Sequence, residues 1–335
     1  MDHPLTAAPR RTVLRGLLGL GAAAVVGTAL PAALPSGAAS ASGRRAARAS
    51  RGLVLGLASP GLPFDGDAFL RTAATLGYTP TSATSYVAWS AGSDFPADQA
   101  RALASYGSTP VITWEPWNPS NGVTQPLYRH AAISAGVHDA YLTRWAQQIK
   151  AYGGRVVLRL MHEGNGSWYP WGVGVNGNTA ASYVAAWRHV VAIFDRVGAT
   201  NARFRWNPNV DPDPAMPRFE TFYPGDAWVD SVSLDGYNWG TTQSWSSWLS
   251  FSETFSGPVN RMLKLTAKPL HIDETGCPEG AGGDKAAWVR GMFDYVAARP
   301  EIRTVTWFDF AKEADWRVLS SQASIDAFKA GLGTA

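Results

Sequence analysis

Cysteine is almost absent from this sequence, which has one, Cys277, among 335 residues. A single cysteine excludes an intramolecular disulfide. No G-x-G-x-x-G motif follows an expected strand, so a dinucleotide-binding fold has little support. After residue 50, no stretch is long and apolar enough to span a bilayer. These absences argue against a disulfide scaffold, a dinucleotide-binding domain and a membrane-embedded domain.

The first 50 residues differ in composition from the rest of the chain. Arg10 and Arg11 precede an apolar run over residues 17–34, and Ala39-Ser40-Ala41 follows that run. A charged start, an apolar centre and an A-x-A-like end are typical of an export signal, and the arginine pair is typical of the twin-arginine route. We predict a twin-arginine signal peptide over residues 1–41, a short flexible tail over 42–51 and one folded domain over 52–335. The protein would then be secreted; an ordinary secretory signal or an uncleaved membrane anchor is the alternative.

A large excess of charge of one sign is also missing once this leader is set aside. The chain has 29 Lys and Arg against 26 Asp and Glu, and the first 50 residues hold six of the arginines and one aspartate. The remaining chain carries a net charge of −2, so the basic pI belongs largely to the leader. Nucleic-acid binding would need a basic patch on the folded domain. We expect no nucleic-acid partner, no stable membrane association after signal cleavage, and a monomer.

Short apolar runs rich in β-branched residues alternate with stretches of helical period. Alternating strands and helices indicate parallel βαβ units, and eight of them predict a single (β/α)₈ TIM barrel in the α/β class, with an open doubly wound sheet as the rival. The expected strands are 53–58, 82–89, 110–114, 155–161, 203–207, 229–234, 269–273 and 305–308. The expected helices are 67–76, 97–106, 137–151, 180–197, 245–265, 285–298 and 321–332.

The carboxyl ends of the expected strands carry many carboxylates, amides and aromatic residues. Enzymes with this fold place their chemistry at these ends. Glu163 follows the fourth strand and Glu274 follows the seventh, so the two lie nearly across the barrel mouth from each other. Cleavage of a glycosidic bond needs one protonated carboxyl group and one ionised carboxylate on opposite sides of the anomeric carbon. Glu163 and Glu274 are therefore candidate catalytic residues; the alternative is that each pairs with an arginine at the rim.

Other hydrolytic chemistries have weaker support. His162-Glu163 does not continue into the helical H-E-x-x-H zinc motif, because residue 166 is Gly. Ser167 and Thr275 lack the G-x-S-x-G turn of a serine hydrolase. The chain has 15 Trp and 11 Tyr, and aromatic faces of this kind pack against the C–H faces of sugars, although a tryptophan-rich core would have the same composition. We expect no metal ligands and no cofactor.

Three motifs carry a resemblance to a known family. Residues 159–171, RLMHEGNGSWYPW, resemble the acid/base signature of glycoside hydrolase family 26. DGYNW at residues 235–239 and IDETG at residues 272–276 resemble its strand-six and strand-seven signatures, in the same order. The resemblance extends from about residue 53 to residue 332. It implies a retaining (β/α)₈ enzyme with Glu163 as general acid/base and Glu274 as nucleophile.

The resemblance also implies roles for neighbouring residues. His162 would contact the sugar beside the cleavage point, Trp168 would pack near the acid/base, and Tyr237 would hydrogen-bond the nucleophile. Trp307 would form the platform under the sugar that is attacked. Further candidate substrate-binding residues are Trp171, Glu115, Arg159, Asn165, Asp235 and Asn238.

Family members are mainly endo-β-1,4-mannanases, with some β-1,3-1,4-glucanases and β-1,3-xylanases. Gly164 stands where mannanases usually carry a larger residue such as Met, and Glu115 stands where they tend to present a His. The sequence therefore predicts a secreted, retaining endo-β-glycanase acting on β-mannan or glucomannan first. Mixed-linkage β-1,3-1,4-glucan and β-1,3-xylan are the alternative substrates. A catalytically inactive, glycan-binding barrel and a cell-surface structural protein are the alternatives from other classes.

Overall fold

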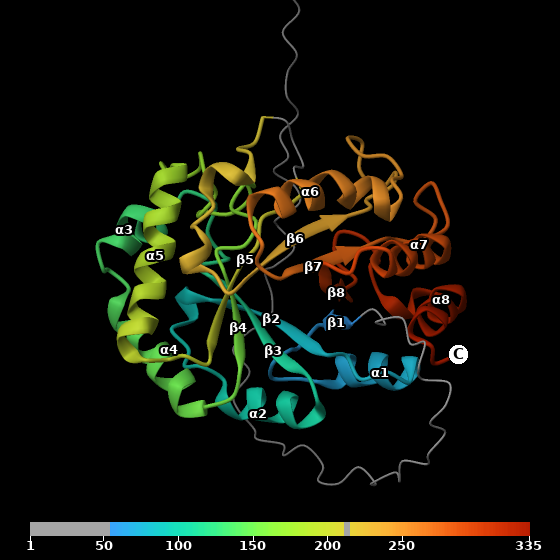
Figure 1. Ribbon diagram of the computed structural model, residues 1–335, viewed down its shortest axis with the longest axis horizontal. Helices are drawn as coiled ribbons and strands as arrows, with labels where there is room; N and C mark the ends of the chain where they lie inside the picture. Colours follow the sequence, from blue (N-terminus) through green and yellow to red (C-terminus); the bar gives the residue numbers. More distant parts are fainter. Residues whose placement is uncertain (1–53, 211–214) are drawn as a thin grey trace, which may run out of the picture.

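The computed structural model describes residues 54–210 and 215–335. Within these residues, parallel strands follow one another in the order β1 to β8, and the barrel closes where β1 pairs with β8 (Figure 1). The predicted (β/α)₈ barrel is confirmed. The strands are β1 Leu55–Ala58, β2 Ser82–Ala88, β3 Thr109–Glu115, β4 Val156–Leu160, β5 Ala202–Trp206, β6 Ser231–Tyr237, β7 Leu270–Gly276 and β8 Ile302–Phe308.

The helices surround the barrel as an outer layer (Figure 1). The α-helices are α1 Asp67–Leu76, α2 Ala97–Tyr106, α3 His130–Ser134, α4 Asp139–Tyr152, α5 Ala180–Val197, α6 Phe251–Leu265, α7 Lys285–Ala297 and α8 Gln322–Leu332. The 3₁₀ helices are η4 Trp89–Ala91, η5 Pro126–Tyr128, η6 Phe219–Phe222, η7 Asp226–Trp228 and η8 Val318–Ser320.

Burial on both faces explains the composition of the strands. Every residue of β4 and β7 is buried, because one face of each strand meets the barrel interior and the other meets the helices. Large aromatic side chains fill the space between strands and helices. Trp114 of β3 stacks on Trp145 of α4, with ring centroids 4.8 Å apart. Some of the tryptophan side chains therefore pack in the hydrophobic core.

Local signals set the helix ends. Helix α6 was expected to begin at residue 245 but begins at Phe251, because Ser250 and Glu253 form a reciprocal capping box there. The residues before Ser250 belong instead to the loop that follows β6. Helix α3 was missed, since its five residues are too few to show a helical period.

Four strands, β3, β6, β7 and β8, are longer than expected. Strand β7 was expected to end at residue 273 but runs to Gly276, so Glu274 lies within it. Strand β6 was expected to end at residue 234 but runs to Tyr237, which carries Asp235 into the barrel. Strand β8 begins at Ile302 rather than residue 305.

The predicted signal peptide and tail lie outside the described residues and stay predictions. In residues 54–210 and 215–335, no helix is both long and apolar enough to cross a membrane.

Candidate active site

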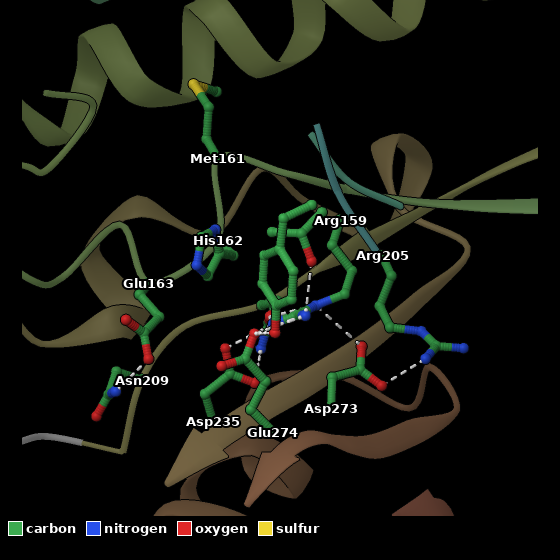
Figure 2. A network of polar contacts seen from close by, with 12 residues as sticks. Arg159, Met161, His162, Glu163, Arg205, Asn209, Asp235, Asp273 and Glu274 are labelled. Carbon is green, nitrogen blue, oxygen red and sulfur yellow. Dashed lines mark hydrogen bonds and ion pairs between the residues drawn. The ribbon is translucent and has the colours of Figure 1, made fainter. Parts of the chain in front are cut away.

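Glu163 and Glu274 lie at the same end of the barrel, one just after β4 and one within β7 (Figure 2). Their relative exposures are 7 % and 5 %, so both carboxyl groups are largely removed from water. The charge of Glu274 acts on the titration of Glu163. The two predicted catalytic residues therefore belong to one electrostatically coupled site.

The backbone around Glu163 has an unusual conformation. Strand β4 ends at Leu160, and Met161 and Glu163 then adopt positive φ angles of 47° and 51°. For residues other than glycine, such angles cost about 1–3 kcal/mol each and cluster at functional sites. The Glu163 N–H donates to the Asn207 carbonyl at 2.6 Å, which holds this turn against β5. The turn directs the Glu163 side chain toward the barrel mouth.

Two neutral donors reach the Glu163 carboxyl group. The Trp168 indole N–H donates to Oε2 at 2.7 Å, and the Asn209 amide donates to Oε1. Burial, together with the charge of Glu274, raises the pKa of Glu163 to about 7, although the two donors act in the opposite direction. A carboxyl group with a pKa near neutrality can both donate and accept a proton in one reaction cycle.

The Glu274 carboxylate has a different set of partners. The Tyr237 hydroxyl donates to Oε2 at 2.7 Å, the Tyr86 hydroxyl donates to Oε1 at 2.8 Å, and Arg159 donates to Oε1 at 2.9 Å. Burial and the charge of Glu274 raise the pKa of both tyrosines well above the usual value, so both remain O–H donors. One cationic and two neutral donors stabilise the negative charge on Glu274 and fix its orientation.

Arg159 is the centre of the buried polar network beneath the site (Figure 2). It contacts Asp235 at 2.6 Å and Asp273 at 3.5 Å, and it also donates to Asn207. Arg205 pairs with the other oxygen of Asp273 at 2.6 Å. Burial alone would raise the pKa of Asp273, but the charges of Arg205 and Arg159 hold it below the usual value. The network keeps several buried charges paired directly beside Glu274.

Arg159 and Asp235 were predicted to bind substrate, and the structure corrects this. Both side chains are completely buried, and their polar atoms form hydrogen bonds with each other and with other protein side chains. They position Glu274 and leave no surface for a sugar.

His162 and Glu115 lie beside the acid/base. The His162 Nε2 atom is 3.2 Å from the Tyr169 hydroxyl, whereas its buried Nδ1 atom has no hydrogen-bond partner and lies 4.0 Å from Glu115 Oε1. Burial, with the charges of Arg159 and Lys312, holds the pKa of His162 well below its usual value, so the ring is neutral. Burial raises the pKa of Glu115 to about 7. His162 is 1 % exposed, so its unpartnered nitrogen faces Glu115 inside the protein and not an open surface.

Trp307 cannot be the predicted sugar platform. Its ring has no exposed surface, packs edge-to-face against Phe328 with a centroid distance of 4.8 Å, and donates from its indole N–H to the Trp316 carbonyl at 2.7 Å. Trp307 therefore faces the helical layer. Its neighbour Phe308 faces the other side and meets Tyr237 at 5.7 Å, because successive strand residues point to opposite faces.

Three further candidates support the site without offering a surface to substrate. All three are buried. Trp171 donates to the His162 carbonyl, Asn165 exchanges hydrogen bonds with the backbone of Asn209, and Asn238 accepts from two backbone N–H groups of its own loop. Their predicted direct contact with sugar is not what the structure shows.

The sequence prediction omitted Tyr86 and Asn209, which each contact one of the two glutamates. Both stand at or just beyond strand ends on the catalytic side, and this position in the sequence could have identified them as site residues. Within the described ranges, no group of three His, Cys, Asp or Glu side chains could hold a metal ion.

Comparisons with known proteins agree with this geometry. Residues 134–257 match the model for glycosyl hydrolase family 26. Endoglucanase H of Acetivibrio thermocellus is 39% identical over 252 residues, which cover 74% of this chain and 27% of that protein. Mannan endo-1,4-beta-mannosidase A and B of Caldalkalibacillus mannanilyticus is 30% identical over 152 residues, which cover 44% of this chain and 25% of that protein. The chain thus spans about a quarter of the length of these relatives.

Solved structures show the same architecture. A family 26 β-mannanase from Bacteroides ovatus superposes with a TM-score of 0.60 over 84% of this chain and 88% of that chain, at 18% identity. At that identity the likeness establishes the fold alone. The family model and the relatives support glycoside hydrolase family 26 for this chain, and the positions of the two buried glutamates, one just after β4 and one within β7, agree with it.

Proposed function

We propose that this protein is a secreted, endo-acting β-glycanase that cleaves its substrate with retention of anomeric configuration. The observation that carries the proposal is the contrast between two buried glutamates. Glu163 has only neutral donors and a pKa raised to about 7, whereas Glu274 is held by Arg159 and two tyrosine hydroxyls. The first environment suits a proton donor and the second suits an anionic nucleophile.

The reaction would proceed in two balanced steps. In the first, the Glu274 carboxylate attacks the anomeric carbon, the glycosidic C–O bond breaks, and the Glu163 proton goes to the leaving oxygen. In the second, Glu163 accepts a proton from water while the water oxygen displaces Glu274 from the anomeric carbon. The partly neutral Glu163 can serve both steps because its pKa lies near the ambient pH.

For the substrate, we favour a β-glucan chain over β-mannan. The relative named endoglucanase matches more of this chain, and at higher identity, than the relatives named mannanases. Glu115 lies 4.0 Å from His162 at the site, and its carboxyl group presents two oxygens where a histidine would present two ring nitrogens. The two residues would select different hydroxyl arrangements. The mannanase relatives make β-mannan or glucomannan the second candidate.

A substrate panel with purified protein tests this proposal. We expect barley β-glucan and lichenan to be cut faster than galactomannan, glucomannan and β-1,3-xylan, with oligosaccharides of mixed length released early. Glu274→Gln should remove nearly all activity and leave the fold intact by circular dichroism. Cleavage of mannan alone would contradict the substrate assignment. A folded protein that binds these polymers but cleaves none would favour the inactive glycan-binding barrel.

A further inference from the structure

The loop between β6 and α6 is held in one conformation by several contacts. The side-chain oxygen of Asn238 accepts from the N–H groups of Gly240 and Leu249, both at 3.1 Å, which ties the two ends of the loop together. Thr241 N–H donates to the Ala281 carbonyl at 2.9 Å, which fastens the loop to the segment after β7. Gly240 has a φ of 51°, and a Cβ there would lie 2.0 Å from the Ala281 carbonyl oxygen, so only glycine fits.

This fixed loop holds a large aromatic side chain toward solvent. Trp245 is 48% exposed, and its ring meets the edge of Trp239 at a centroid distance of 5.6 Å. Trp239 is itself supported by Trp316, with centroids 4.9 Å apart and ring planes at 88°. A tryptophan exposed to this extent forgoes part of the free energy of burial.

The rings continue inward to the nucleophile. Tyr237 lies 6.0 Å from Trp239 and 5.1 Å from Trp316, centroid to centroid, and its hydroxyl donates to Glu274. The loop follows the carboxyl end of β6, the end at which Glu163 and Glu274 lie; Figure 1 shows it between β6 and α6. The aromatic row therefore leads from the reacting centre outward to Trp245.

The surroundings of Trp245 suit a neutral, hydroxylated ligand. Residues 240–250 contain no charged side chain, and Thr241, Thr242, Ser244 and Ser247 of the same loop are exposed. An apolar protein partner would meet mostly hydroxyl groups here, and a nucleic acid would meet no positive charge. Sugars present C–H faces that pack on aromatic rings and hydroxyls that bond to such side chains.

We propose that Trp245, supported by Trp239, is a binding platform for a sugar unit of the β-glycan chain beyond the unit attacked at Glu274. This inference rests on the proposed function, since it assigns a second part of the same substrate to this loop. Long chains reach Trp245, and substrates that end near the cleavage point do not.

Three variants test the platform. Trp245→Ala removes the ring, Trp245→Phe keeps an aromatic face, and Leu263→Ala is the control. Leu263 is exposed, but it lies near the end of α6 that faces away from the site, because α6 runs antiparallel to the strands. Each variant is assayed for kcat/KM on barley β-glucan and on a short aryl β-cellobioside.

For Trp245→Ala we expect kcat/KM on the polymer to fall about tenfold, as the loss of one ring-to-sugar contact implies, with little change on the aryl cellobioside. Trp245→Phe should retain most of the polymer activity, and Leu263→Ala should match the parent. Equal activity of Trp245→Ala and parent on the polymer, or equal losses on both substrates, would overturn the platform.

A binding measurement separates this inference from the proposed function. Calorimetry with a cello-oligosaccharide on Glu163→Gln, with and without Trp245→Ala, reports the platform even if no substrate is cleaved. Weaker binding in the double variant, together with an inactive parent protein, would support the platform and refute the glycanase. Equal binding by Glu163→Gln and by the double variant would overturn the platform, whatever the activity of the parent protein.

Discussion

At the scale of single residues, Glu163 and Glu274 differ in the groups that donate to them. Glu163 accepts from Trp168 and Asn209, whose neutral donors lower its pKa without fully offsetting burial. Glu274 accepts from a guanidinium and two hydroxyls. The assignment of acid/base and nucleophile follows from this difference, and each partner can be removed to test it.

The Trp168 donor sets part of the pH dependence. It stabilises the charged form of Glu163, so Trp168→Phe should raise the pKa of Glu163 above its value of about 7. The first step needs protonated Glu163, so kcat/KM falls as pH rises through this pKa, and the variant's alkaline limb should move to higher pH. The pH profile of kcat/KM measures this shift. Leu263→Ala, near the end of α6 that faces away from the site, should leave the limb in place. A shift to lower pH in Trp168→Phe would contradict the assigned role.

Packing, and not direct contact with substrate, explains why residue 164 is a glycine. A Cβ at Gly164 would lie 2.6 Å from the ring of Tyr183 and 3.2 Å from that of Phe222. The absence of the larger residue found in mannanases thus reflects the aromatic side chain that occupies the space.

Gly164→Ala should accordingly lower the free energy of unfolding by about 1–3 kcal/mol, because a buried ring must shift. Gly122→Ala is the control, since a Cβ there meets open space. Denaturant titration of both variants checks the difference. Equal stability of the two variants would contradict the packing explanation, because it would show that the neighbouring rings can move at little cost in free energy.

At the scale of elements, strands β4, β5, β6 and β7 share one buried charge network through Arg159, Arg205, Asp235 and Asp273. Removing one partner of a buried ion pair leaves an uncompensated charge and costs about 3–5 kcal/mol. Arg159→Met should therefore destabilise the barrel by about that amount and also lower kcat, because Glu274 loses its cationic partner.

Arg203→Met is the matched control for this network. Arg203 pairs with Asp230 at 3.0 Å, but both side chains are substantially exposed. Such a pair contributes about 0–1 kcal/mol. Thermal unfolding of the two variants should separate them clearly. An Arg159→Met protein as stable as Arg203→Met would refute the view that this network supports the site.

The elements also show what could be predicted from the sequence. Apolar runs that alternate with stretches of helical period predicted the position of every strand. The glutamates after the fourth and seventh expected strands predicted the position of the site. Strand bounds failed by up to three residues, as in β6, where a buried Arg159 allows Asp235 to remain inside the barrel. The local pattern of apolar and polar residues does not show that Asp235 pairs with Arg159, a residue far away in the sequence.

The direction of side chains was harder to predict than their position. Trp307 and Phe308 are adjacent aromatic residues at the end of β8, so residue type could not decide which of them faces the site. Asn238 lies beside the site, but its amide is used to close a loop whose shape depends on Ala281, far along the chain. Local composition carries no information about these contacts.

At the scale of the whole molecule, the proposal includes export by the twin-arginine route. Replacing both Arg10 and Arg11 by Lys should block export while leaving folding and activity of the retained protein intact. The amount of enzyme in the medium measures this, and N-terminal sequencing of the exported protein should begin near Ser42. Normal export of the double variant would show that another route is used, and a start well beyond Arg51 would contradict the domain boundary.

The proposed mechanism requires Glu163 and Glu274 to have distinct roles on opposite sides of one bond. The most direct test is the anomeric configuration of the glycosyl azide that each alanine variant forms from an aryl β-glycoside with a good leaving group. Glu274→Ala should give the azide of inverted configuration, because azide attacks from the side that the carboxylate vacated. Glu163→Ala should give the azide of retained configuration, because azide attacks the anomeric carbon of the glycosyl-enzyme intermediate and displaces the Glu274 carboxylate. Exchange of these two products between the variants would contradict the assignment.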